Sequence, residues 1–156
     1  MPQNLTYNDV LNSTGTELEP SQWLLIDQPR IQAFADATDD HQYIHTDPKR
    51  AAQTELGGTI AHGLLSLSLL PGLAGETMLM PQGMAMGINY GFNKVRFLST
   101  VRPGDEVRTR ALVVSVDEKS PGRLLVALDL TLEVKGQDKP ALVCEWLNLF
   151  VGGHNS

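Results

Sequence analysis

An acidic and a basic side chain, Asp40 and His45, lie five residues apart in one polar segment of this 156-residue chain. Further along, Gly63 opens a strongly apolar stretch. The first backbone N–H groups of a helix have no acceptor within the helix, so they can hold a developing negative charge. Chemistry beside a carbonyl needs an acid–base pair and oxyanion donors. The pattern therefore predicts an active site made from Asp40, His45 and the backbone of Gly63.

Other polar residues near this pair allow further interpretations. His41 and His45 would share one face, as metal ligands do, only if their segment were helical. The segment carries capping residues and is predicted to be a loop, so we expect no metal there. His62 precedes Gly63 and is expected either to position this loop or to contact the substrate, and Asp47 is expected to cap the helix that follows.

Helix signals flank the polar segment on both sides. Asp27 followed by Pro29 predicts a helix over 28–38 that ends before Asp39. Asp47 and Pro48 predict a second, short helix by the same pattern. The stretch from Gly63 to about Ala74 is apolar around nearly its whole circumference, so we expect a buried helix, kinked or interrupted at Pro71. Shorter elements are expected over 5–11 (helix) and 23–26 (strand).

From residue 84 onward the apolar period changes to two, which is typical of strands. Strands are predicted over 84–97, 106–116, 123–134 and 141–151, separated by turns at 103–105, 118–122 and 135–140. The apolar phase slips by one residue near Asn93 and Lys94, which predicts a bulge. The last strand is apolar on both faces, so it should lie in the middle of the sheet or at a subunit contact. Long antiparallel strands wrapped around one apolar helix make an α+β fold.

The bulk properties limit the classes of protein. We expect one domain over residues 1–156. The formal charge of −6 argues against a nucleic-acid partner. Residues 1–4 show no signal peptide, and no apolar run approaches the roughly 20 residues of a membrane span. Cys144, the single cysteine, is expected in the core, consistent with a reducing, cytoplasmic setting.

These residues also resemble a known family. The pattern Asp40-x4-His45-x-Asp47-Pro48, with Ile60-Ala61-His62-Gly63 opening the helix, resembles the hydratase motif of MaoC-like (R)-specific enoyl-CoA hydratases. The run from Ile88 to Phe97, continued by Val101-Arg102-Pro103-Gly104-Asp105, resembles the nodulation-protein-N-like subgroup. The chain departs from the pattern at Gln42-Tyr43, where the motif usually has Asn-Pro, and at Thr100, where proline is common.

The resemblance implies the hot-dog fold, in which a sheet wraps around a central helix. It also implies reversible syn hydration of trans-2-enoyl-CoA to (3R)-3-hydroxyacyl-CoA, with Asp40 and His45 as the catalytic dyad. Which of the two acts as the base stays open. The backbone N–H of Gly63 would stabilise the thioester oxygen.

The predicted bulge supplies further candidates, because bulges often re-aim side chains beside a site. Asn93 is a candidate for substrate binding. Lys94 and Arg96 are candidates for the coenzyme A phosphates, although a solvated strand face explains them equally well. The chain has no phosphate-binding glycine loop, and no cofactor is expected.

Two other functions remain open at this point. The hot-dog fold also hosts acyl-CoA thioesterases, which place their acid on or near the central helix, whereas here both acid and base precede it. A non-catalytic acyl-thioester-binding protein is the third interpretation. In each case we expect a homodimer, because the last strand and the flank of the site need cover.

Overall fold

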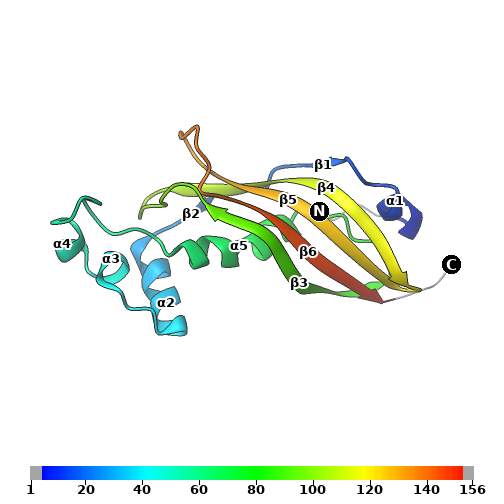
Figure 1. The fold of residues 1–156 in the computed structure, drawn as a ribbon, viewed down its shortest axis with the longest axis horizontal. Helices are drawn as coiled ribbons and strands as arrows, with labels where there is room; N and C mark the ends of the chain where they lie inside the picture. The colour runs from blue at the N-terminus through cyan, green and yellow to red at the C-terminus, as the bar shows by residue number, and fades with distance from the viewer. Residues whose placement is uncertain (1–4, 153–156) are drawn as a thin grey trace.

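The computed structural model describes residues 5–152, so the expectation about a leader in residues 1–4 lies outside the described part of the chain. Six strands form one antiparallel sheet, which curves along one helix, α5 (Figure 1). The strands are β1 Glu17–Leu18, β2 Leu24–Leu25, β3 Met84–Phe97, β4 Glu106–Ser120, β5 Arg123–Val134 and β6 Leu142–Gly152. Their order is β1-β4-β5-β6-β3, and β2 also pairs with β4. The predicted α+β architecture is confirmed.

The long strands follow the predicted pattern with one difference in length. β6 lies between β5 and β3, as its apolar character on both faces predicted. β4 continues to Ser120, so the turn predicted over 118–122 shrinks to the residues just before β5. Gly122 has a φ of 76° there, a conformation that glycine adopts without strain.

β3 forms one edge of the sheet and pairs, within the described chain, with β6 alone. The register shifts between Asn93 and Arg96, and Lys94 has a φ of 54°, so the predicted bulge is confirmed. Ile88 is 43% exposed and Tyr90 is 64% exposed. A long edge strand with exposed apolar side chains is a template for pairing with another chain.

The helices are α1 Tyr7–Leu11, α2 Gln28–Thr38, α3 Tyr43–Thr46, α4 Pro48–Ala51 and α5 Gly63–Gly75. The predicted caps are confirmed. Asp27 accepts a hydrogen bond from the backbone N–H of Arg30 at 2.9 Å, and Asp47 accepts one from Arg50 at 3.0 Å. α2 ends at Asp39, whose φ of 59° is left-handed. None of the helices in residues 5–152 is both long and apolar enough to cross a bilayer.

The prediction of a loop over 39–47 is wrong for the middle of this segment, where α3 makes one helical turn. The backbone N–H of Asp47 donates to the carbonyl of Tyr43 at 3.0 Å. Gln42, at the N-cap position, makes no capping hydrogen bond through its side chain. Four residues without a capping signal are too short for a periodic pattern, so the sequence does not mark this turn.

One face of α5 lies in the core of the protein. Leu65, Leu70 and Leu73 are buried and belong to the same apolar cluster as Trp146 and Phe150 of β6. The opposite face is open, and Leu64 on it is 59% exposed. The expectation of a fully buried helix is therefore wrong for the single chain, because the sheet covers one side only. The helix also continues past Pro71 to Gly75.

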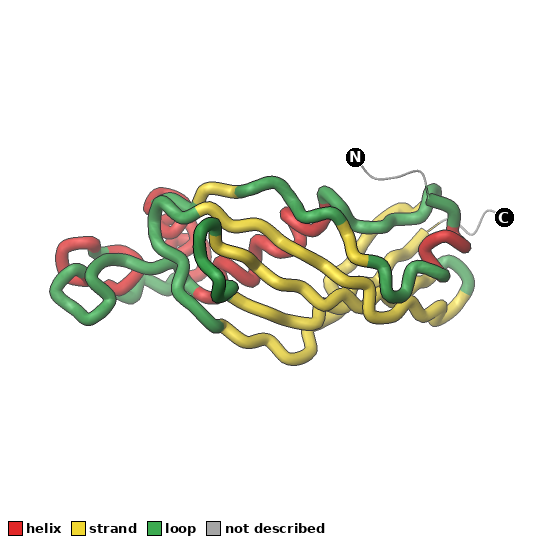
Figure 2. Tube along the Cα trace, turned by 90° about the horizontal axis from the view of Figure 1, so that it is seen from above, coloured by secondary structure: helices red, strands yellow, loops and turns green. Residues whose placement is uncertain are grey.

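Three short helices extend beyond one end of the sheet. Figures 1 and 2 both show α2, α3 and α4 grouped there, next to the N-terminal end of α5. α3 packs against both α2 and α4. This group, residues 28–51, carries the polar segment that the sequence marked for chemistry.

Candidate active site

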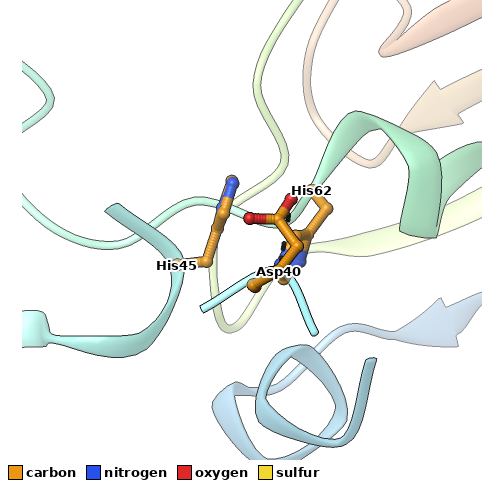
Figure 3. Close-up of side chains that lie close together, drawn as sticks. All are labelled: Asp40, His45 and His62. Carbon is orange, nitrogen blue, oxygen red and sulfur yellow. Dashed lines mark hydrogen bonds and ion pairs between the residues drawn. The ribbon is translucent and has the colours of Figure 1, made fainter. Parts of the chain in front are cut away.

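Asp40, His45 and His62 come from three separate segments and meet at one point (Figure 3). Asp40 follows α2, His45 lies on α3, and His62 is the N-cap residue of α5. One oxygen or nitrogen from each side chain lies within 4.8 Å of the other two. The structure therefore brings together the two residues proposed for acid–base chemistry, with a second histidine beside them.

His45 is held by its buried surroundings. Its side chain is 7% exposed, and its Nδ1 lies 2.7 Å from the backbone carbonyl oxygen of Ile60. A carbonyl oxygen only accepts hydrogen bonds, so Nδ1 carries the proton. In the neutral ring Nε2 then keeps its lone pair. His45 is thus arranged to accept a proton at Nε2.

His62 contacts both members of the pair. Its ring stacks on that of His45, with centroids 3.8 Å apart and planes inclined by 23°. Its Nε2 donates to the backbone carbonyl of Asp40 at 3.0 Å, and it lies 4.0 Å from a carboxylate oxygen of Asp40. Phe34 of α2 packs on the same ring with a centroid distance of 4.9 Å. These contacts fit the expected positioning role.

Asp40 occupies the open side of the cluster. Its side chain is 50% exposed, whereas that of His62 is 3% exposed. The left-handed residue Asp39 turns the chain directly before it. A buried imidazole and a partly exposed carboxylate can bind one water molecule between them, with the carboxylate on the solvent side.

Gly63, which directly follows His62 in the chain, lines an apolar pocket. The pocket has a volume of about 430 Å³ and is lined by Ile60, Ala61, Gly63, Leu64, Phe97, Leu98, Ser99, Thr100 and Val101. Gly63 is the first residue of α5, so its N–H has no acceptor within the helix. A Cβ at this position would lie 3.0 Å from the ring of Phe97. Glycine thus allows Phe97 to pack against the helix start.

The structure does not bring Asn93, Lys94 or Arg96 to this cluster. Asn93 donates to Glu145 at 2.7 Å. On the partner strand β6, the residue after Glu145 is Trp146, which is buried in the core. Asn93 and Glu145 therefore lie on the face of the sheet that points away from the core. Lys94 and Arg96 are exposed, and neither forms an ion pair with another described residue. The bulge re-aims these side chains toward solvent.

His41 is also separate from the cluster. Its Nε2 lies 2.8 Å from a carboxylate oxygen of Asp36, on the exposed surface of α2. The hydrogen bonds from His41 and then Gln32 hold the pKa of Asp36 below its usual value. The metal pair considered from the sequence, His41 with His45, is therefore not formed.

The cluster of Asp40, His45 and His62 has the residue types of a metal site, but its geometry fits poorly. Nε2 of His62, which lies 4.0 Å from the carboxylate of Asp40, donates to the carbonyl of Asp40 and so has no lone pair to offer a metal. The arrangement therefore suits proton transfer better than coordination.

Sequence reasoning missed the residues that support His45. Gln28 at the start of α2 donates through Nε2 to the backbone carbonyl of His45 at 2.7 Å. Thr59 donates through its hydroxyl to Oε1 of Gln28 at 2.6 Å. Nothing in their local patterns marks them, because both contacts join segments far apart in the chain.

A curved antiparallel sheet along one central helix, with an acid and a histidine before that helix, is the arrangement of hot-dog dehydratases. The model of the MaoC-like domain family matches residues 9–134. The chain belongs to this family.

Relatives cover nearly the whole chain. It is 43% identical to nodulation protein N of Rhizobium meliloti over 92% of this chain and 89% of that protein. It is 42% identical to 3-hydroxyacyl-thioester dehydratase Z of Mycobacterium tuberculosis over 92% and 94% of the two chains. The solved (R)-hydratase from A. caviae involved in PHA biosynthesis superposes with a TM-score of 0.71 at 27% identity, over 86% and 94% of the two chains. These matches confirm the predicted family and fold.

Proposed function

We propose that this protein is an (R)-specific enoyl-CoA hydratase. It adds water reversibly to trans-2-enoyl-CoA and forms (3R)-3-hydroxyacyl-CoA. The observation that carries this proposal is the meeting of Asp40 and His45 with His62, whose next residue, Gly63, lines an apolar pocket. Relatives named 3-hydroxyacyl-thioester dehydratase and (R)-hydratase support the same reaction class.

The geometry supports a role for each group. Water binds between the carboxylate of Asp40 and Nε2 of His45. His45 takes one proton as the water oxygen attacks the β-carbon, and the electrons of the double bond move to the thioester oxygen, where the N–H of Gly63 stabilises them. His45 then returns the proton to the α-carbon. Because one group takes and returns the proton on one face, the addition is syn.

The apolar acyl chain of the substrate matches the apolar lining of the pocket. Phe97, Leu64 and Leu98 supply apolar surface around Gly63, and all three are substantially exposed in the single chain. An acyl chain laid against them would remove apolar surface from water, which favours binding. The acyl-CoA thioester is accordingly the proposed substrate class.

A second copy of the chain is the proposed partner. The open face of α5 and the edge of β3 that pairs with no other described strand leave Leu64, Ile88 and Tyr90 exposed. Pairing of two β3 edges would satisfy backbone groups and cover these side chains together. We therefore expect a homodimer whose contact also closes the flank of the pocket.

One assay separates the proposal from its alternatives. Purified protein is mixed with crotonyl-CoA, and both the loss of enoyl absorbance and the release of free thiol are followed. Loss of the enoyl group without thiol release, with (3R)-hydroxybutyryl-CoA as the product on a chiral column, is expected. Thiol release would instead indicate a thioesterase, and no reaction would indicate a non-catalytic acyl-thioester-binding protein.

A further inference from the structure

The side chain of Gln28 joins α3, which carries His45, to the segment that contains Thr59. Its amide nitrogen lies 2.7 Å from the carbonyl oxygen of His45, and its amide oxygen lies 2.6 Å from the hydroxyl of Thr59. Thr59 is 5% exposed, and Gln28 is half-buried. The side chain of Gln28 thus bridges α3 and the irregular segment before α5.

The direction of both hydrogen bonds follows from the chemistry of the groups. The carbonyl of His45 only accepts, so the NH2 of Gln28 faces it. The amide oxygen of Gln28 therefore faces Thr59, and the hydroxyl of Thr59 donates. No other orientation of the amide satisfies both partners, so the bridge has one arrangement.

The residues next to this bridge make the contacts that orient the imidazole. The backbone N–H of Ile60 donates to the carbonyl of Ile44 at 3.0 Å, and Nδ1 of His45 donates to the carbonyl of Ile60 at 2.7 Å. Gln28 ties His45 to Thr59, the neighbour of Ile60. The bridge therefore fixes the distance between the ring and the carbonyl that selects its tautomer.

We propose that Gln28 and Thr59 are positioning residues, which hold His45 with Nδ1 protonated and the lone pair on Nε2. The role in turnover rests on the hydratase function proposed above. Neither residue reaches the reacting atoms. They act through the backbone and ring of His45, in the way that supporting hydrogen bonds fix the tautomer of other functional histidines.

The test compares variants that remove or keep single hydrogen bonds. Gln28→Met keeps the length of the side chain but removes both bonds. Gln28→Glu keeps the acceptor for Thr59 and loses the donor to His45. Thr59→Val removes the hydroxyl, whereas Thr59→Ser keeps it. Gln32→Met is the matched control, because Gln32 lies on the same helix and its side chain donates to the exposed Asp36 at 3.0 Å.

We expect Gln28→Met and Gln28→Glu to lower kcat by about 10- to 100-fold with little change in KM, since small misplacement of a catalytic group costs this much. Thr59→Val should lower kcat less, while Thr59→Ser and Gln32→Met stay near wild type. The 15N chemical shifts of His45 should show the Nδ1-protonated tautomer in the wild type and a mixture of tautomers in both Gln28 variants.

Two outcomes would overturn the inference. One is a wild-type tautomer in both Gln28 variants. The other is a lowered melting temperature with unchanged kcat, which would mark a purely structural bridge. The tautomer measurement needs no turnover, so it still decides the matter if the wild type fails to hydrate crotonyl-CoA and the proposed function falls.

Discussion

The rings of His45 and His62 stack with their centroids 3.8 Å apart, and His62 also donates to the backbone carbonyl of Asp40 at 3.0 Å. One buried ring therefore contacts both members of the proposed dyad. Its position before α5 connects the dyad to the helix whose first N–H is the proposed oxyanion donor.

The two contacts of His62 can be separated by substitution. His62→Phe keeps an aromatic ring for the stack but loses the hydrogen bond to Asp40, and His62→Ala loses both. We expect a fall in kcat of about tenfold for His62→Phe and a larger one for His62→Ala, because misplacement of acid–base groups slows proton transfer. Steady-state kinetics and melting temperatures provide the test. A His62→Ala enzyme with wild-type kcat would contradict the positioning role.

Removal of either dyad side chain should abolish most turnover. Asp40→Asn and His45→Gln keep similar shapes but lose the carboxylate charge and the imidazole base. Each should lower kcat for crotonyl-CoA at least about a hundredfold, the usual contribution of a positioned acid–base group. Circular dichroism should show an intact fold. If both variants turn over at the wild-type rate, the site assignment is wrong.

The oxyanion role of Gly63 can be tested by removing its N–H alone. Proline is tolerated at the first position of a helix, and the ψ of 137° at His62 suits a residue before proline. Gly63→Ala adds a Cβ against Phe97 but keeps the N–H, so it controls for crowding. We expect kcat of Gly63→Pro to lie about 100- to 1000-fold below that of Gly63→Ala, as for loss of one oxyanion donor. Equal kcat values would exclude this N–H.

The proposed homodimer should depend on the edge of β3. Light scattering at micromolar concentration should give twice the 17.0 kDa mass of one chain. Ile88→Lys combined with Tyr90→Lys places charge on that edge and should produce monomers, because lysine blocks edge pairing. Leu112→Lys is the control, since Leu112 is 36% exposed on β4, away from β3. A monomeric wild type would contradict the dimer.

Stability should fall in alkaline solution through Tyr7. Its hydroxyl donates to Glu118 at 2.6 Å. Burial, and then the hydrogen bond and charge of Glu118, raise the pKa of Tyr7 from 10.0 to about 12. The folded chain therefore holds this proton more tightly than the unfolded chain. The stabilisation is complete below pH 10.0 and is lost as the pH rises toward about 12.

Urea unfolding measured from about pH 9 to about pH 11 checks this sign. Tyr7→Phe should reduce the loss of unfolding free energy over that range. Some loss should remain in the variant, because burial also raises the pKa of the Cys144 thiol to about 11. Identical pH slopes for the wild type and Tyr7→Phe would show that the tyrosine is not the source.

The sequence predicts most of the fold because its signals are local. Asp27 and Asp47 mark helix starts through caps that need no distant partner. The phase slip at Asn93 marks the bulge through the alternation of its neighbours. The exposure of Leu64 was not predictable in this way, since apolar periodicity shows that a helix face needs cover but not whether the same chain supplies it.

The site was predictable in part for the same reason. Asp40, His45 and Gly63 lie in a motif whose spacing is visible in the chain, and the structure brings the three segments together. Asn93 was associated with the site because a bulge lies there, yet the bulge turns it toward Glu145. Gln28 and Thr59 carry no local signal. Their proposed role depends on hydrogen bonds between residues that lie 17 and 31 positions apart in the chain.

The grouping of α2, α3 and α4 beyond the end of the sheet has a mechanical consequence (Figure 2). Ile31 of α2 belongs to the core cluster, whereas no residue of α3 or α4 does. Local opening of α3 and α4, which carry His45, should therefore require less free energy than unfolding of the whole domain, because regions with few core contacts open first. On heating, the proposed turnover should accordingly be lost below the temperature at which the sheet unfolds.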